Sequence, residues 1–179
     1  MNPEIKQERL QSRLGPEIKE FRESRRTLQL ATVSKEGKPN VSYTPFALID
    51  GSYYILISKI ARHACNLLEN PQVSFMMIED ESGLKMVHAR KRLTYEANAE
   101  IIERETAQWQ TVIDSMKEKF GEIIDNLSNM ADFTLFHLAP KNGLFVKGFG
   151  KAFQVGSDDL IDVVHLDQGH QTIDKNKEV

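Results

Sequence analysis

The sequence contains only one cysteine, Cys65, among 179 residues. A single cysteine cannot form an internal disulfide, and it excludes a metal site built from several thiolates and Cys-x-x-Cys redox chemistry. No apolar run approaches the roughly 20 residues that a membrane-spanning helix needs. The first ten residues, MNPEIKQERL, lack an apolar signal segment. We therefore expect a cytoplasmic protein that does not insert into a membrane.

No excess of one charge is present either. Lysine and arginine number 23 against 26 aspartates and glutamates, a net charge of −3. Such a chain has no overall field that would attract nucleic acid or an anionic membrane. No Ser-His-Asp or Cys-His motif stands out, so hydrolytic catalysis has no support. We expect no nucleic-acid partner.

The composition is that of one globular domain. Hydrophobic residues make up 40% of the chain and charged residues 27%, which is the usual balance for a soluble fold. The length suits a single domain, and the chain contains no repeat or low-complexity segment. We expect one domain over residues 1–179, with an N-terminal helical segment at 1–25 and a C-terminal helix and tail at 157–179.

Apolar residues recur at helical spacing in three stretches. Residues 3–24 predict two helices, because Gly15-Pro16 interrupts the run and proline suits the first turn of a new helix. Residues 61–70 predict a short helix. Residues 105–127 predict helix with one interruption at a glycine.

A last helix is expected after Ser157, which can cap it ahead of Asp158 and Asp159. Gly169 fits the left-handed position that follows a helix end. His170 then lies just past this helix, in a polar segment where a histidine is usually only solvated.

Several segments predict β-strands, because they are rich in β-branched and aromatic residues or alternate between apolar and polar. Glycines in VKGFG, at residues 146–150, open no helix and are expected to let a strand bend. About six or seven strands without regular βαβ crossovers predict an α+β protein built on a β-barrel. The expected strand segments are 27–34, 40–49, 52–58, 72–80, 87–101, 132–140 and 143–155.

The stretch from Arg25 to Glu81 resembles the split-barrel flavoproteins that include pyridoxamine 5'-phosphate oxidase. The resemblance rests on a strand meander, a strand ending in serine, the turn NLLENPQVS and an acidic strand end. Within that group, ARKRLTYEA, FGEIIDNLSNMADF, GLFVKGFGKAFQV and VHLDQGH resemble the HutZ/HugZ-type heme-utilisation proteins. The likeness runs from about residue 3 to residue 172.

This resemblance implies an antiparallel split β-barrel of the FMN-binding type with flanking helices, assembled as a homodimer. It implies that heme binds between the protomers and is degraded with O2 and an external electron donor to a linear tetrapyrrole, which releases iron. Heme-delivery and reductase partners are then expected as well.

The resemblance also places four candidate site residues in this sequence. The family's heme-ligating histidine falls at His170, and a neutral imidazole is the usual iron ligand where O2 reacts. Asp132 matches an aspartate from the opposite protomer that accepts the ligand's other N–H; alone, it reads as a turn residue. Arg92 could pair with a propionate or serve the reacting oxygen, or belong to a solvated stripe with Arg90. His63 could help bind heme, pair with Asp132 across the interface, or be an ordinary helix histidine.

The other histidines have simpler interpretations. His88 is expected to be solvated, His137 partly buried and hydrogen-bonded, and His165 packed on the last helix.

Two further functions stay open. A heme carrier or storage protein would need the same His170 ligand with little turnover. A flavin enzyme of the pyridoxamine oxidase kind would bind FMN and need cations for its phosphate, for which Arg25, Arg26 and Lys59 are the nearby candidates.

Overall fold

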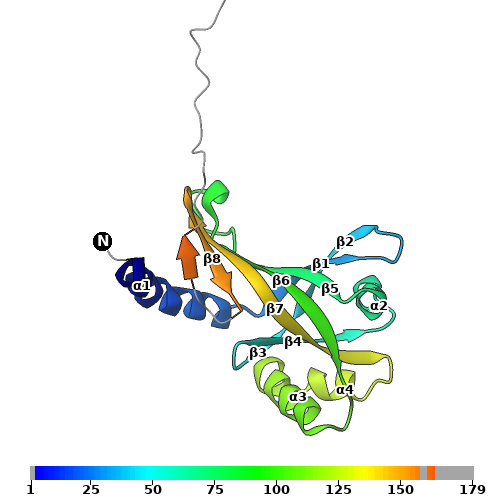
Figure 1. Cartoon of the computed structure of the whole chain (residues 1–179). Coiled ribbons are helices and arrows are strands. Elements are labelled where there is room, and N and C mark those ends of the chain that lie inside the picture. The colour runs from blue at the N-terminus through cyan, green and yellow to red at the C-terminus, as the bar shows by residue number, and fades with distance from the viewer. Residues whose placement is uncertain (1–2, 158–160, 164–179) are drawn as a thin grey trace, which may run out of the picture.

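The computed structural model describes residues 3–157 and 161–163. Nine strands in this part of the chain form one sheet in which every pairing is antiparallel. The main order is β2-β1-β5-β6-β7-β4-β3, and β8 and β9 extend from β7 (Figure 1). The strands are β1 (Thr27–Val33), β2 (Pro39–Pro45), β3 (Ala47–Ile49), β4 (Ser52–Ser58), β5 (Gln72–Ile78), β6 (Arg92–Ile102), β7 (Phe133–Gly148), β8 (Lys151–Gly156) and β9 (Ile161–Val163).

Four α-helices and one 3₁₀ turn flank this sheet in the described part of the chain. They are α1 (Pro3–Glu23), α2 (Arg62–Glu69), η1 (Val87–Ala89), α3 (Ala107–Phe120) and α4 (Ile123–Ser128). The α+β class and the antiparallel sheet are therefore confirmed. No helix of the described residues is long and apolar enough to cross a membrane.

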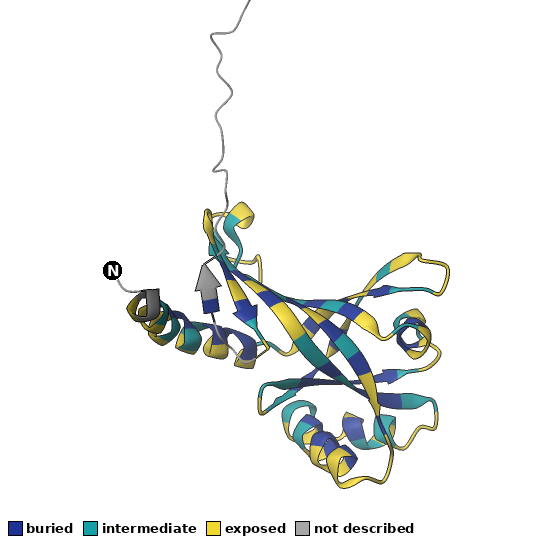
Figure 2. Cartoon of the chain, viewed as in Figure 1, coloured by how far each residue is buried: buried dark blue, intermediate teal, exposed yellow. Residues whose placement is uncertain are grey.

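The sheet divides along β7, which is 16 residues long. Its first half pairs with β4 and its second half with β8, while β6 follows it on the other side. Two cores result (Figure 2). The larger lies inside the curved sheet and under α1 and α2, and the smaller lies between α3, α4 and the β3–β4 side of the sheet.

Aromatic rings fill the larger core. Tyr53 packs on Phe75 and Tyr95, with ring centroids 4.8 Å and 5.7 Å apart. Gly143 of β7 lies across from Tyr95, where a Cβ atom would be 2.5 Å from the ring. Only glycine lets the strand approach the ring this closely.

The N-terminal helix is continuous, so the predicted break at Gly15-Pro16 is wrong. Leu10, Leu14, Ile18 and Phe21 are all buried along one face. Each contributes about 1.5–3 kcal/mol when fully buried. Together they outweigh the roughly 3 kcal/mol cost of a proline inside a helix.

Residues 87–91 are not strand, contrary to the prediction for 87–101. Val87–Ala89 forms a 3₁₀ turn, and β6 begins only at Arg92. The partner strand β5 ends at Ile78, so the preceding residues have no full ladder to join.

The C-terminal prediction is also wrong where it can be compared. Ile161–Val163 forms strand β9 on β8, with Ile161 buried, rather than part of a helix. Side chains of α1 bind its other edge: Gln7 donates to the Ile161 carbonyl, and the Ile161 N–H donates to Gln11 Oε1 at 3.0 Å. The remaining predicted helix, with Gly169, lies outside the described residues.

The glycines of VKGFG act as expected. Gly148 has φ +156° and Gly150 φ +63°, and the chain reverses there from β7 into β8. The observed strand count exceeds the predicted six or seven because residues 40–49 form two strands, and β9 is added.

Candidate functional site

Asp132 lies in the short connection between α4 and β7 and is held at two points. Its carboxylate Oδ2 accepts a hydrogen bond from Ser58 Oγ at 2.5 Å. Its main-chain carbonyl accepts from the Lys59 N–H at 2.7 Å. Both contacts come from the end of β4, so the aspartate has a defined position and is more than a solvated turn residue.

Arg104 holds the rest of this connection. Its guanidinium donates to the carbonyls of Ser128, Met130 and Phe133 at 2.5 to 2.7 Å. The same group lies 4.7 Å from the centroid of the Trp109 ring. A planar cation with five donors suits such a set of acceptors, and it fixes the main chain on both sides of Asp132.

His63 lies on α2 and is half-buried. Its Nδ1 is 2.9 Å from Ser42 Oγ on β2. Burial lowers the pKa of His63 below its ordinary value of 6.5, because a desolvated imidazolium is unfavourable. The imidazole is therefore neutral at pH 7, as a metal ligand or hydrogen-bond acceptor must be.

A mostly apolar cavity of about 230 Å³ lies between α3, α4 and the end of β4. Ser58 and His63 supply its polar lining. The apolar lining comes from Pro45, Leu56, Ile57, Met116, Phe120, Ile124, Leu127 and Phe133. The fold thus brings His63 and the Ser58–Asp132 pair to one end of the sheet, around one apolar hollow.

Arg92 lies elsewhere, at the first residue of β6. Its Nη1 donates to the Arg90 carbonyl at 3.2 Å. Because side chains alternate along a strand, Arg92 and Thr94 share one face of the sheet. That face carries the row Thr94, Met76, Gln29 and Tyr43 across four strands, and none of these four side chains is buried.

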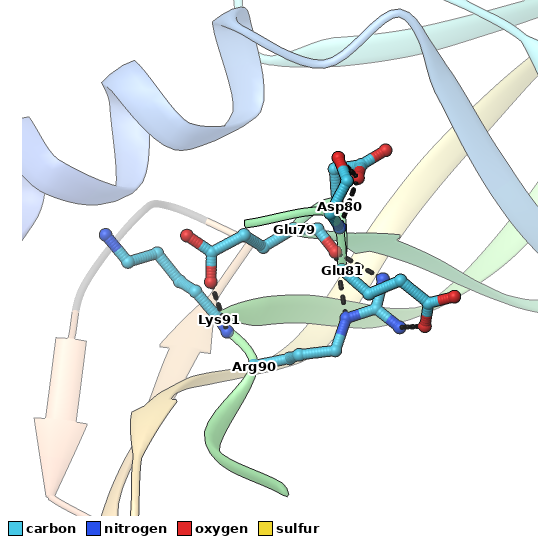
Figure 3. Close-up of polar contacts among 6 residues, drawn as sticks. Glu79, Asp80, Glu81, Arg90 and Lys91 are labelled. Carbon is cyan, nitrogen blue, oxygen red and sulfur yellow. Dashed lines mark hydrogen bonds and ion pairs between the residues drawn. The ribbon is translucent and has the colours of Figure 1, made fainter. Parts of the chain in front are cut away.

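The residues before Arg92 are bonded to the acidic residues that follow β5 (Figure 3). Arg90 donates from Nε to the Glu79 carbonyl at 2.9 Å and from Nη1 to Glu81 Oε2 at 3.2 Å. The Lys91 N–H donates to Glu79 Oε2 at 3.1 Å. The prediction that Arg90 is a freely solvated cation is therefore wrong. His88 is exposed, as predicted.

One protomer does not bring Arg92 and Asp132 together. The strand β6 has 11 residues, so its ends are about 33 Å apart. Arg92 is at its start, while Ile102 at its end pairs with Leu135, close to Asp132. A site that uses both residues must draw them from two copies of the chain.

His170 lies outside the described residues, as does His165. The described chain ends with Val163 of β9, seven residues before His170. Seven residues span at most about 25 Å. Val163 pairs with Phe153, which pairs with Phe145, which pairs with Leu93. Val163 therefore lies three strands from Leu93, at the end of the sheet that holds Arg92 and opposite to the end near Asp132.

His137 is partly buried, as predicted. Its ring stacks on Tyr54 with centroids 5.1 Å apart, and Nδ1 is 3.4 Å from Glu100 Oε2. Residues 3–157 and 161–163 contain no group of three or more acidic, histidine or cysteine side chains placed to hold a metal ion.

The cations proposed for a flavin phosphate make local contacts instead. Arg25 lies 5.2 Å from the Phe21 ring, and Arg26 lies 5.5 Å from the Phe120 ring. Lys59 is exposed in the loop beside Asp132.

Ser58 and Arg104 are the site residues that sequence reasoning missed. Ser58 ends an apolar strand, a visible signal, but its partner is 74 residues away. Arg104 looks like an ordinary surface arginine between a strand and a helix, and no pattern indicates its three acceptors.

The family model for pyridoxamine 5'-phosphate oxidase matches residues 14–147. The chain therefore belongs to the pyridoxamine 5'-phosphate oxidase family. Within it, the chain is 61% identical to "Heme oxygenase HutZ" of Vibrio cholerae over 173 residues, 97% of this chain and 98% of that protein.

Two solved structures are similar in fold and sequence. The structure of HutZ from Vibrio cholerae, described as the heme storage protein, has a TM-score of 0.72 at 61% identity, covering 76% of this chain and 96% of that one. ChuZ from Campylobacter jejuni has a TM-score of 0.82 at 34% identity, covering 90% of this chain and 67% of that one. The chain is thus a HutZ-type member of the family.

Proposed function

We propose that this protein is a heme oxygenase, which degrades heme with O2 and reductant to a linear tetrapyrrole and releases iron for nutritional use. The observation that carries this proposal is the 61% identity, over nearly the whole of both chains, to a protein named heme oxygenase. The activity is proposed for the cytoplasm, with a heme-delivery partner and a reductase supplying substrate and electrons.

The side chains at the candidate site suit heme. A large flat macrocycle needs apolar walls, and its two propionates need cations. Met116, Phe120 and Phe133 line an apolar hollow beside Asp132, and Arg92 lies on the exposed face of the sheet. Bound heme supplies the O2 chemistry, and the protein supplies ligation, orientation and exclusion of competing reactions.

Each candidate residue has a role in this proposal. His170 is the iron ligand, and Asp132 accepts its other N–H, which fixes the tautomer and increases electron donation to iron. Arg92 binds a propionate or donates to the oxygen that reacts. His63, neutral and near Asp132, contributes to the heme pocket.

A homodimer is proposed to complete the site. Arg92 lies at the start of β6, and Val163 lies three strands away at the same end of the sheet, while Asp132 lies near the other end of β6. The outer face of the sheet exposes two apolar side chains of β2, Val41 by 79% and Tyr43 by 70%, which a second copy would cover. A second copy that covers this face would bring its Asp132 toward the first copy's Arg92 and His170.

Heme storage is the second candidate, because the solved Vibrio cholerae structure is described as a storage protein. Loss of the Asp132 carboxylate separates the two functions. An oxygenase with Asp132→Asn degrades heme more slowly while its heme affinity is kept, whereas a storage protein has little turnover to lose. An FMN enzyme is the third candidate, and flavin absorbance in the purified protein would favour it.

The first test is a hemin titration of the wild type and of His170→Ala, followed at the Soret band, with ascorbate then added in air. Loss of a direct iron ligand should weaken binding on the order of 100-fold, at the upper end of the effect of outer-shell partners. The wild type should lose its Soret band and gain tetrapyrrole absorbance.

His165→Ala is the matched control from the same segment and should bind hemin like the wild type. Equal binding by all three proteins would reject His170 as the ligand. Tight binding without bleaching would favour storage.

A further inference from the structure

The Ser58 hydroxyl makes a short contact with the Asp132 carboxylate. Ser58 Oγ donates to Oδ2 at 2.5 Å and accepts from the Ile60 N–H at 3.2 Å. Because a hydroxyl has one hydrogen to donate, the incoming Ile60 bond directs that hydrogen toward Asp132. A hydrogen bond to an ionised carboxylate is about twice as strong as a neutral one.

The contact also fixes how the two carboxylate oxygens are turned. Ser58 takes one acceptor position of Oδ2, while both acceptor positions of Oδ1 are left to a further donor. The Lys59 N–H and Arg104 hold the main chain on either side of the aspartate, so the carboxylate can turn about its side-chain bonds only if the Ser58 bond breaks.

We infer that Ser58 is a positioning residue, which locks the Asp132 carboxylate so that Oδ1 accepts the N–H of the iron-bound imidazole. This inference rests on the proposed function. In this role the serine bonds to the aspartate and not to the iron or to O2. It acts by keeping the imidazole–carboxylate bond aligned, and therefore by keeping electron donation to iron high.

The position of the pair supports this role over a purely structural one. Ser58 is the last residue of β4, beyond the buried run Tyr53–Ile57, and it lines the apolar cavity with His63.

The test compares Ser58→Ala, Asp132→Asn and the double variant, each loaded with hemin and reduced under nitrogen. Resonance Raman spectroscopy measures the iron–imidazole stretching frequency. We expect Asp132→Asn to lower this frequency and Ser58→Ala to lower it by a smaller amount. The double variant should match Asp132→Asn alone, because the serine acts only through the aspartate.

Ser58→Thr keeps a hydroxyl and should restore the wild-type frequency, which a packing role would not require. Ser12→Ala removes a serine hydroxyl from the exposed side of α1 and should change nothing. Turnover with ascorbate should slow about tenfold in Ser58→Ala, within the range known for outer-shell partners, while hemin affinity stays near that of the wild type.

A measurement without heme checks the contact itself. A double-mutant cycle of Ser58→Ala and Asp132→Asn on chemical unfolding of the apoprotein should give a coupling energy different from zero. If Asp132→Asn shifts the Raman band and Ser58→Ala does not, the inference is wrong while the proposed function stands. If the wild type binds no hemin, the proposed function fails, and zero coupling in the apoprotein would reject the contact independently.

Discussion

At the scale of single residues, the candidate site depends on polar side chains held at the rim of an apolar hollow. His63 is one of them, half-buried and bonded to Ser42. Its lowered pKa has a simple cause, since burial disfavours the charged imidazolium. Protonating His63 in the folded protein should therefore lower the free energy of unfolding at low pH.

The pH dependence of stability should therefore contain a His63 contribution. The folded pKa is below the unfolded value of 6.5, so the unfolded chain binds the proton first. Stability is full above pH 6.5 and decreases as pH falls through the folded pKa. Urea unfolding between pH 7.5 and 5 should show this decrease, and His63→Gln should flatten it.

His88→Gln is the control for this measurement, because His88 is exposed. It should leave the pH profile unchanged. A profile that is equally steep with His63→Gln would show that burial of His63 has no effect on stability.

At the scale of elements, α1 contacts three parts of the chain at the end of the sheet where Arg92 lies. Glu17 binds Lys147 of β7 at 2.5 Å and Lys91, just before Arg92, at 3.0 Å. Gln7 and Gln11 bind β9, from which the C-terminal segment continues. The helix therefore contacts the residue before Arg92 and the strand after which the segment with His170 follows.

Glu17→Gln should loosen this helix at neutral pH. Burial alone would raise the pKa of Glu17, but hydrogen bonds and charges of Lys147 and Lys91 lower it overall. The ion pairs stabilise the fold above pH 4.5, and that stability is lost as pH falls through the lower folded pKa. Because solvent screens partly exposed pairs, the loss should be about 0.5–1 kcal/mol.

Urea unfolding at pH 7 and pH 3.5 would measure this loss, which should shrink at the lower pH. Glu20→Gln, on the exposed side of α1, is the matched control. An equal loss from both substitutions would mean that the two lysines contribute nothing specific.

At the scale of the whole molecule, β6 keeps the two ends of the candidate site apart. The same strand carries Arg92 at its start and leads toward Asp132 at its end. The exposed apolar side chains Val41 and Tyr43 lie on the face that Arg92 shares. Assembly and heme binding should therefore be coupled.

Tyr43→Asp should separate the protomers, because it places a charge on the face proposed to be covered. Analytical ultracentrifugation should show a monomer for this variant and a dimer for the wild type. Hemin affinity should decrease about tenfold or more, since each site would lose every contact that the partner makes with heme and not the Asp132 carboxylate alone. Ile5→Asp, at an exposed position on α1, should remain a dimer; equal mass for the wild type and Tyr43→Asp would contradict the proposed interface.

Much of the fold follows from local pattern. The alternation in β6 correctly predicts that Leu93, Tyr95, Ala97 and Ala99 are buried. It fails at the end of the strand, where Ile101 is 49% exposed and Ile102 is buried. There α3 covers the opposite face of the strand. The alternation of side chains along β6 cannot predict that a helix from another part of the chain packs on it.

Local pattern and resemblance together were sufficient for the antiparallel α+β sheet, the family and the list of candidate residues. These depend on side-chain periodicity and on motifs that are contiguous in the chain. They could not reveal that α1 continues through Pro16 or that Ser58 holds Asp132. Nor could they reveal that Arg92 and Asp132 of one protomer lie at opposite ends of β6. Those outcomes depend on burial and on hydrogen bonds between residues that are far apart in the sequence. Such contacts form, and stabilise the protein, only in the folded chain.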